Sequence, residues 1–322
     1  MRTEAVHGGV GEPGGTANPV PVGAQTAVEA RPPVVPAGKR GTRSARRGRS
    51  GRRMLSHLGL ILFGCFMLYP LIWMVSSSFK PTGEIFREPG LIPTNPTLDN
   101  YPAGWTALDS DFGRYILNSL LIVAGAIVGN IVACSMAAYA FARLKFPLRR
   151  MWFAIMLGTM MLPIHVVIVP QYIVYAQLDW INTYWPLIVP KLLATDAFFV
   201  FLMVQFIRGL PRELDDAARI DGCGHLGIFL RIIMPLAMPA VATTAIFTFI
   251  WTWNDFFSQL IFLTDPDMYT VPVALRSFVD ATSRTPWGPV FAMSVVSIAP
   301  IFGFFLAGQR YLVRGIATTG LK

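Results

Sequence analysis

Residues 212–235 read RELDDAARIDGCGHLGIFLRIIMP, and six of the first ten are charged. In the whole chain of 322 residues, 53% are hydrophobic and only 14% are charged. Long apolar blocks lie on both sides of this segment. The nature of those blocks therefore decides what a short, densely charged segment does between them.

The apolar blocks have the length of membrane spans. The hydrocarbon core of a bilayer is about 30 Å thick, and about 20 helical residues cross it. Five runs contain no Asp, Glu, Lys or Arg: Met54–Phe79, Tyr115–Ala142, Met151–Leu178, Ile232–Asn254 and Thr285–Gln309. A sixth run, Trp180–Ile207, contains only two charged residues, Lys191 and Asp196. A water-soluble chain of this size cannot bury six such helices on all sides. We therefore expect an all-α integral membrane protein with six transmembrane helices.

Lys and Arg residues orient the six predicted spans. Cytoplasmic loops are enriched in these residues. An N-terminus inside the cell puts 21 of the 27 on the cytoplasmic side and five outside, with Lys191 within a span. Both termini are then cytoplasmic, in the cell membrane, and the net charge of +9 does not indicate nucleic-acid binding. The composition of residues 1–53 predicts a disordered basic cytoplasmic tail. Residues 54–322 are predicted to form the transmembrane domain.

Polar residues within spans are candidates for a transport pathway, because they are costly in lipid and usually face protein or water. Asp196 lies roughly 18 Å from the inner face of the membrane, at the usual helical rise. Lys191 is expected to extend its ammonium toward the outer end of the span. A direct pair between the two needs a distortion beside Pro190, because five residues turn an ideal helix by about 140°.

The fifth span ends in a second polar group, TWNDF at Thr252–Phe256. Asn254 and Asp255 are expected toward the outer side. Trp251 either anchors the span at the membrane interface or presents an aromatic face on which a sugar ring stacks. With Asp196, these three residues form the candidate pathway lining.

The charged segment itself predicts a short cytoplasmic helix, Pro211–Asp221. Proline suits a first helical position, acidic residues favour the first turns, and Gly222 predicts a stop with positive φ. Leu214, Ala217, Ala218 and Asp221 share one narrow face. Such a face fits a groove on a partner, but a solvated loop is an equal alternative on these residues alone. A second short helix, His225–Met234, leads back to the membrane.

The segment resembles the EAA signature loop of permease subunits of ABC importers. Asp216-Ala217-Ala218, Gly222, Ile232 and Met234-Pro235 have that spacing, with Asp216 in place of Glu and Met234 in place of Leu. Further motifs resemble the carbohydrate-uptake branch, namely WMVSSSFKP (Trp73–Pro81), PTLDNY (Pro96–Tyr101), NSLLIV (Asn118–Val123), AAYAFARLKFP (Ala137–Pro147), ARIDGCG (Ala218–Gly224), WNDF (Trp253–Phe256) and YTVPVAL (Tyr269–Leu275). The chain is similar to the second, six-span permease of maltose-type systems.

The resemblance implies one half of a heterodimeric pathway for a sugar or oligosaccharide, working by alternating access. It also implies a second related permease, two ABC ATPase subunits that bind ATP and Mg²⁺, and an extracytoplasmic sugar-binding protein. The implied ATPase-coupling residues are Pro211, Arg212, Glu213, Asp216, Ala217, Ala218, Asp221 and Gly222. The chain contains no phosphate loop of the GxxxxGK[ST] type, so we expect no catalytic residues, cofactor or metal in this subunit.

The main alternative is a secondary transporter driven by an ion gradient. It would use Lys191, Asp196 and Asp255 as an ion or proton relay. Such folds usually carry internal repeats, which are not apparent in this sequence. The identity of the sugar cannot be read from these residues.

Overall fold

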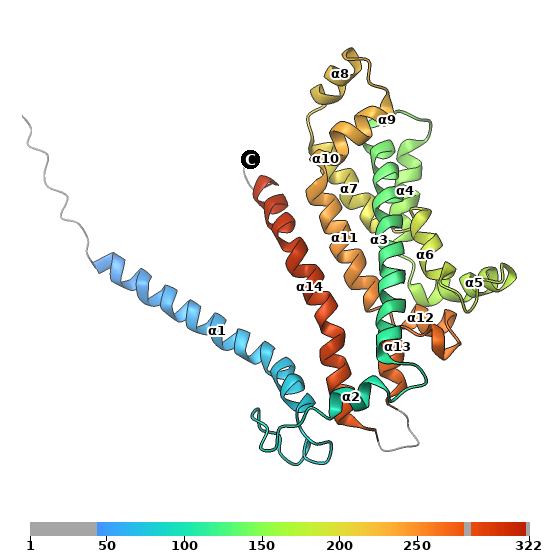
Figure 1. The fold of residues 1–322 in the computed structure, drawn as a ribbon. Helices are drawn as coiled ribbons and strands as arrows, with labels where there is room; N and C mark the ends of the chain where they lie inside the picture. The colour runs from blue at the N-terminus through green and yellow to red at the C-terminus, as the bar shows by residue number, and fades with distance from the viewer. Residues whose placement is uncertain (1–43, 280–284, 320–322) are drawn as a thin grey trace, which may run out of the picture. The chain divides into compact units, whose positions relative to one another are not determined.

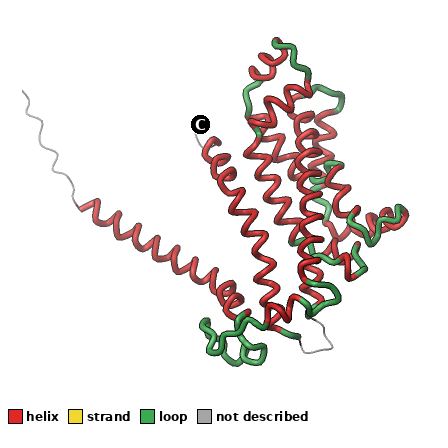
Figure 2. Tube along the Cα trace, viewed as in Figure 1, coloured by secondary structure: helices red, strands yellow, loops and turns green. Residues whose placement is uncertain are grey.

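A computed structural model describes residues 44–279 and 285–319, and all regular secondary structure within them is helical (Figure 2). The helices are α1 (Ser44–Ser78), α2 (Asn100–Trp105), α3 (Phe112–Arg143), α4 (Arg149–Thr159), α5 (Ile164–Gln177), α6 (Trp185–Leu192), α7 (Ala197–Gly209), α8 (Glu213–Ile220), α9 (His225–Ile228), π-helical η1 (Phe229–Ile233), α10 (Met234–Leu236), α11 (Met238–Trp253), α12 (Phe257–Phe262), 3-10 helical η2 (Pro266–Met268), α13 (Val271–Ser277) and α14 (Trp287–Thr319).

The predicted first domain, residues 1–53, lies mostly outside the described residues. The described chain divides into two units, the first of which ends at Ile61 within α1. Helix α1 begins at Ser44, and the disorder of residues 1–53 stays a prediction. The cores, ion pairs and cavities described below belong to the second unit, whereas the stretch Met54–Ser78 begins in the first.

Apolar helices account for the six predicted spans. Four stretches are long and apolar enough to cross a bilayer by themselves: Met54–Ser78, Phe112–Arg143, Trp185–Gly209 and Trp287–Arg310. Two further stretches are bent pairs, Arg149–Thr159 with Ile164–Gln177 at 101° and His225–Leu236 with Met238–Trp253 at 75°. The six-span prediction agrees with the structure if each bent pair counts as one span.

The third and fifth predicted spans are each interrupted by a bend. The third breaks before Pro163, which stands in an extended conformation at the start of α5. The residue that precedes a proline is disfavoured in the helical region, so a break just before Pro163 has a local cause. The fifth breaks at Ala237, between Pro235 and Pro239. Each proline removes a backbone N–H that a continuous helix would use.

Helix α3 is the central element, packing against α6, α7 and α11, while α11 also packs against α14 (Figure 1). Close approach to α6 depends on small residues. A Cβ atom on Gly125 would lie 3.0 Å from the Ile188 side chain, and one on Gly129 would lie 3.0 Å from Lys191. The absence of a side chain at these two positions thus allows α3 and α6 to approach closely.

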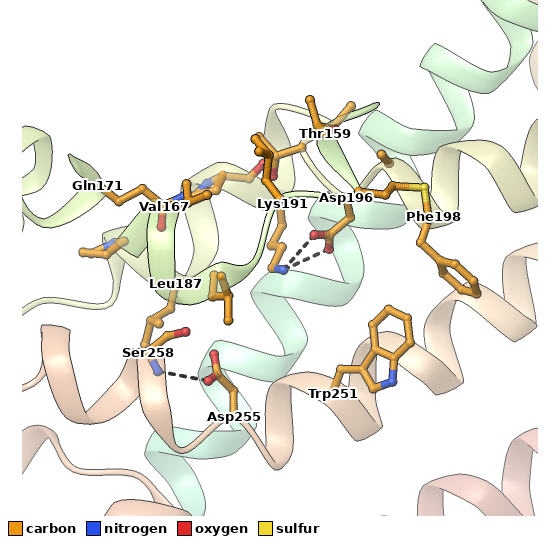
Figure 3. A pocket seen from close by; sticks show the side chains of 18 of the residues that line it. Thr159, Val167, Gln171, Leu187, Lys191, Asp196, Phe198, Trp251, Asp255 and Ser258 are labelled. Atoms are coloured by element: carbon orange, nitrogen blue, oxygen red, sulfur yellow. Dashed lines mark hydrogen bonds and ion pairs between the residues drawn. The ribbon is translucent and has the colours of Figure 1, made fainter. Parts of the chain in front are cut away.

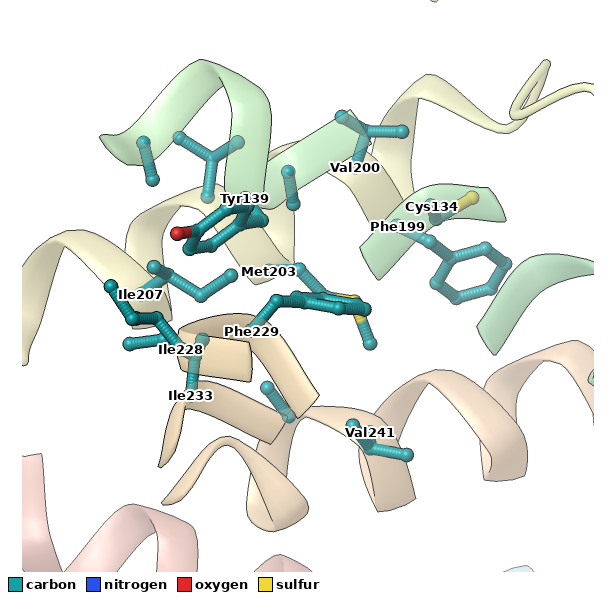
Figure 4. Close-up of a cluster of buried hydrophobic side chains, with 14 of the residues drawn as sticks. Cys134, Tyr139, Phe199, Val200, Met203, Ile207, Ile228, Phe229, Ile233 and Val241 are labelled. Carbon is teal, nitrogen blue, oxygen red and sulfur yellow. The ribbon is translucent and has the colours of Figure 1, made fainter. Parts of the chain in front are cut away.

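One hydrophobic core lies where α3, α7, α9 and η1 meet (Figure 4). Tyr139 of α3 packs against Phe229 of η1, with ring centroids 5.3 Å apart. Phe199 and Met203 of α7 and Ile233 of η1 are fully or almost fully buried in the same core. This core supports the end of the bundle that carries α8.

The segment between α1 and α3 contains the short helix α2, which packs against α14. Its organising residue is Lys80, whose buried Nζ donates hydrogen bonds to the carbonyl oxygens of Glu88 (2.7 Å) and Gly90 (2.5 Å). The side-chain amide of Asn100 donates to the carbonyls of Ser78 and Lys80, both at 2.8 Å. Side-chain donors thus connect the backbone carbonyl groups of this segment.

Candidate functional site

The charged segment forms helix α8, which stands at the end of the bundle opposite α2 and α13 (Figure 1). The predicted helix is confirmed, although it begins at Glu213 and not at Pro211. Its first turn holds Glu213, Asp215 and Asp216, where the positive end of the helix dipole stabilises carboxylates. Gly222 has φ of +84°, as predicted, because the chain leaves the helix through a left-handed turn.

The expected partner-facing surface of α8 is only partly correct. Leu214, Ala217 and Asp221 are exposed along one face. Ala218 is 5% exposed and lies in the core beneath α8. The expectation that Ala218 faces outward is therefore wrong, because its Cβ points toward the bundle.

Asp215 joins α8 to the bundle, and sequence reasoning did not select it. Its Oδ2 atom lies 3.0 Å from Nε of Arg143, the last residue of α3. Both side chains are buried, at 7% and 2% exposure. Beside this pair is a polar cavity of about 560 Å³. It is lined by Arg143, Leu144, Lys145, Arg212, Asp215, Asp216, Arg219 and His225.

A second cavity, of about 710 Å³, lies within the predicted membrane region (Figure 3). Its walls come from α4 to α7, from α11 and α12, and from the connections between them. Most of the lining is apolar, but Lys191, Asp196 and Asp255 contribute charged groups. Two predicted pathway carboxylates therefore lie on one cavity.

Lys191 and Asp196 form a direct ion pair, with Nζ 2.9 Å from Oδ2 and 3.1 Å from Oδ1 (Figure 3). In place of the expected extension toward the outer end, the ammonium turns back to the carboxylate. The required distortion is present as a break between α6 and α7, where Ala194 has φ of +54°. Pro190 remains helical within α6, so the break follows the proline.

Asn130 and Thr248 complete this polar group, and sequence reasoning missed both. The buried amide of Asn130 donates to Oδ2 of Asp196 at 2.7 Å and to Oγ1 of Thr248 at 3.0 Å. Helices α3, α6, α7 and α11 are thereby connected at the start of α7. The available signal was an Asn in the middle of an apolar run, since a buried amide needs partners.

The other predicted lining residues behave differently from one another. Trp251 lines the cavity, is 48% exposed, and has its ring centroid 5.1 Å from that of Phe198. Asp255 also lines the cavity and accepts a hydrogen bond from the Ser258 backbone N–H at 3.1 Å. Asn254 is not among the lining residues, because its amide turns back to the Ile250 carbonyl at 2.7 Å. Its place in the pathway of the assembled transporter stays a prediction.

The described residues contain no group of three or more His, Cys, Asp and Glu side chains arranged to hold a metal ion. The polar groups that line the two cavities are charged side chains, hydroxyls, an imidazole and an amide.

Comparison with known proteins identifies a family of membrane transport proteins. The family model described as "Binding-protein-dependent transport system inner membrane component" covers residues 129–318. The probable ABC transporter permease protein YurM of Bacillus subtilis is 35% identical, over 82% of this chain and 86% of its own length. The trehalose/maltose transport system permease protein MalG of Thermococcus litoralis is 33% identical, over 84% of this chain and 97% of its own.

The fold also resembles that of a solved ABC transporter. A chain of the crystal structure of a bacterial ABC transporter involved in the import of the acidic polysaccharide alginate superposes with a TM-score of 0.73. At 21% identity, the match covers 84% of this chain and 98% of that chain. The protein therefore belongs to the family of inner-membrane components of binding-protein-dependent transport systems, which are multi-pass permeases of ABC transporters.

Proposed function

We propose that this chain forms half of the transmembrane pathway of an ATP-driven importer for a sugar or oligosaccharide. Relatives named as permeases for trehalose or maltose and for diacetylchitobiose support the substrate class. The main observation behind this proposal is that one chain has two features together. One is α8, a charged helix with an exposed face at the end of the bundle, and the other is a membrane cavity at the level of Asp196. The family match leaves the gradient-driven alternative without support.

The partners follow from the family and from the surfaces of this chain. A second, related permease completes the pathway, and two ATPase subunits bind ATP and Mg²⁺. An extracytoplasmic binding protein delivers the sugar, in keeping with the family description and with an alginate transporter solved in complex with a pentasaccharide-bound periplasmic protein. This chain hydrolyses no ATP itself. Both termini and α8 are cytoplasmic, and α2 lies on the outer side.

The exposed face of α8 docks in a groove of one ATPase subunit. Leu214 and Ala217 supply a narrow apolar contact, and Asp216 and Asp221 orient it by charge. Arg212 and Glu213 flank this face, while Pro211 and Gly222 shape the turns at each end. ATP and the loaded binding protein shift the transporter toward an outward-open state because they bind that state better.

The membrane cavity forms part of the sugar path. Trp251 presents a half-exposed aromatic face to it, and sugar rings stack on such faces. Asp255 offers a carboxylate that accepts hydrogen bonds from hydroxyl groups. The Lys191–Asp196 pair keeps two charges fixed at the cavity wall, so that neither is unpaired when the path is closed to water.

The test is ATP-dependent uptake by the complex purified through a tag on this chain and reconstituted in lipid vesicles. The probes are radiolabelled trehalose, maltose and diacetylchitobiose, offered with the co-purified binding protein. We expect uptake of at least one of them to require ATP and to continue in the presence of a protonophore. Uptake that needs an ion gradient and no ATP would contradict the proposal.

A further inference from the structure

Arg143 holds the charged helix α8 to the central helix α3. Its guanidinium Nε lies 3.0 Å from Oδ2 of Asp215, and both side chains are almost completely buried. A buried ion pair between two helices fixes their relative position, because separating the charges leaves both without a counter-ion. The pair is thus a mechanical joint between α3 and α8.

The same guanidinium also grips the loop that leads into α8. Nη2 of Arg143 donates a hydrogen bond to the carbonyl oxygen of Leu210 at 2.9 Å and approaches that of Pro211 at 3.5 Å. One side chain therefore holds both the start of the loop and the first turn of the helix. A lysine would retain the charge but not this forked geometry.

The other ion pair on α8 has no such effect. Asp216 and Arg219 are both on α8, 3.2 Å apart, with side chains that are half or more exposed. An exposed pair three residues apart within one helix contributes little to stability and cannot connect α8 to the bundle. Within the described chain, Ala218 in the core and the Arg143–Asp215 pair supply the side-chain attachment.

Helix α3 extends from this joint to the membrane cavity. It is continuous from Phe112 to Arg143. Asn130, which binds Asp196 at the cavity wall, lies 13 residues before Arg143, or roughly 20 Å along the helix. A continuous helix is stiff over that length, so displacement at Arg143 is carried to Asn130.

We propose that Arg143 is a positioning residue for transport, which makes α3 move together with α8 and so transmits displacement of α8 to the Asn130–Asp196 junction. The inference rests on the proposed function, in which α8 docks on an ATPase. It adds the route within this chain by which docking reaches the pathway.

The test is the ratio of sugar uptake to ATP hydrolysis in the reconstituted complex. The main variant is Arg143→Met/Asp215→Leu, because replacing both members of a buried ion pair by apolar residues commonly preserves folding. We expect assembly and ATP hydrolysis to be retained. The ratio should fall about three- to tenfold, the usual size of coupling effects. Arg143→Lys, which keeps the charge alone, should give an intermediate ratio.

The control is Arg150→Met, the same substitution at an exposed position on α4, which should leave the ratio unchanged. A wild-type ratio in the double variant would overturn the inference, as would a parallel fall of uptake and hydrolysis. If the double variant does not assemble, the ratio of uptake to hydrolysis is measured for Arg143→Lys instead. A wild-type ratio in that variant would then overturn the inference. Absence of ATP-driven uptake by the wild-type complex would instead refute the proposed function.

Discussion

Two ion pairs in this protein differ in exposure, and the difference separates their roles. Lys191 and Asp196 are about one quarter exposed and line the membrane cavity, whereas Arg143 and Asp215 border the polar cavity at α8 but are almost completely buried. A partly exposed pair can be solvated and can meet a passing ligand. A pair with almost no exposed side-chain surface has little contact with either, so we expect its role to be mechanical. On the proposed function, burial therefore separates groups placed to contact a substrate from groups placed to transmit motion.

The largest difference in stability is expected when one member of each ion pair is replaced. Arg143→Met leaves a buried, unpaired carboxylate and should destabilise the chain by about 3–5 kcal/mol. Lys191→Met should cost less, because Asp196 retains Asn130 as a donor and contacts the cavity. Thermal unfolding in detergent measures both. An equal loss in the two variants would remove the distinction.

The two alanines of α8 extend the comparison to packing. Ala218→Trp forces a large ring into the core beneath the helix and should destabilise the chain by about 1–3 kcal/mol. Ala217→Trp places the same ring on the exposed face and should leave the unfolding temperature nearly unchanged. Equal unfolding temperatures for the two variants would show that Ala218 is not seated in the core.

At the cavity, Asp196→Leu removes the acceptor for Lys191 and one of the two acceptors for the Asn130 amide. A buried amide N–H without an acceptor costs about 1–3 kcal/mol, so we expect impaired sugar uptake with the complex still assembled. Asp196→Asn keeps an acceptor oxygen and should retain more uptake. Normal uptake by Asp196→Leu would show that this carboxylate has no role in the pathway.

The smallest effect is expected at the turn after α8. Gly222→Val places a branched side chain at φ of +84°, which costs about 1–2 kcal/mol. A Cβ there meets no other atom within 4 Å, so the cost is conformational. Gly222→Asn should be milder, since Asn tolerates this region. ATPase retention during purification compares them, and identical retention would contradict the need for a left-handed turn.

Local features of this chain were predictable from its sequence. The lengths of the apolar runs indicate the spans, and Gly222 ends α8 as its position predicts. Helical geometry also gives the condition for the Lys191–Asp196 pair, because five residues place the two side chains on different faces of an ideal helix and a direct pair needs a distortion. Each of these depends on residues that are close in the chain.

Features that depend on distant residues were not predictable. Proline does not by itself mark a break, since Pro70 and Pro300 lie inside the continuous helices α1 and α14. The periodicity of α8 places Ala217 and Ala218 near each other but does not tell which one meets the bundle. The partner of Asp215 is on another helix, so no local pattern reveals Arg143.

The central claim is that α8 is the docking element for an ATPase, and Ala217→Trp tests it most directly. The measurement is the amount of ATPase that co-purifies with this chain, together with sugar-stimulated ATP hydrolysis by the reconstituted complex. We predict a folded permease that reaches the membrane and has lost both the ATPase and the stimulated hydrolysis. Full retention of both by the Ala217→Trp variant would contradict the account, because the exposed face of α8 would then contact no partner.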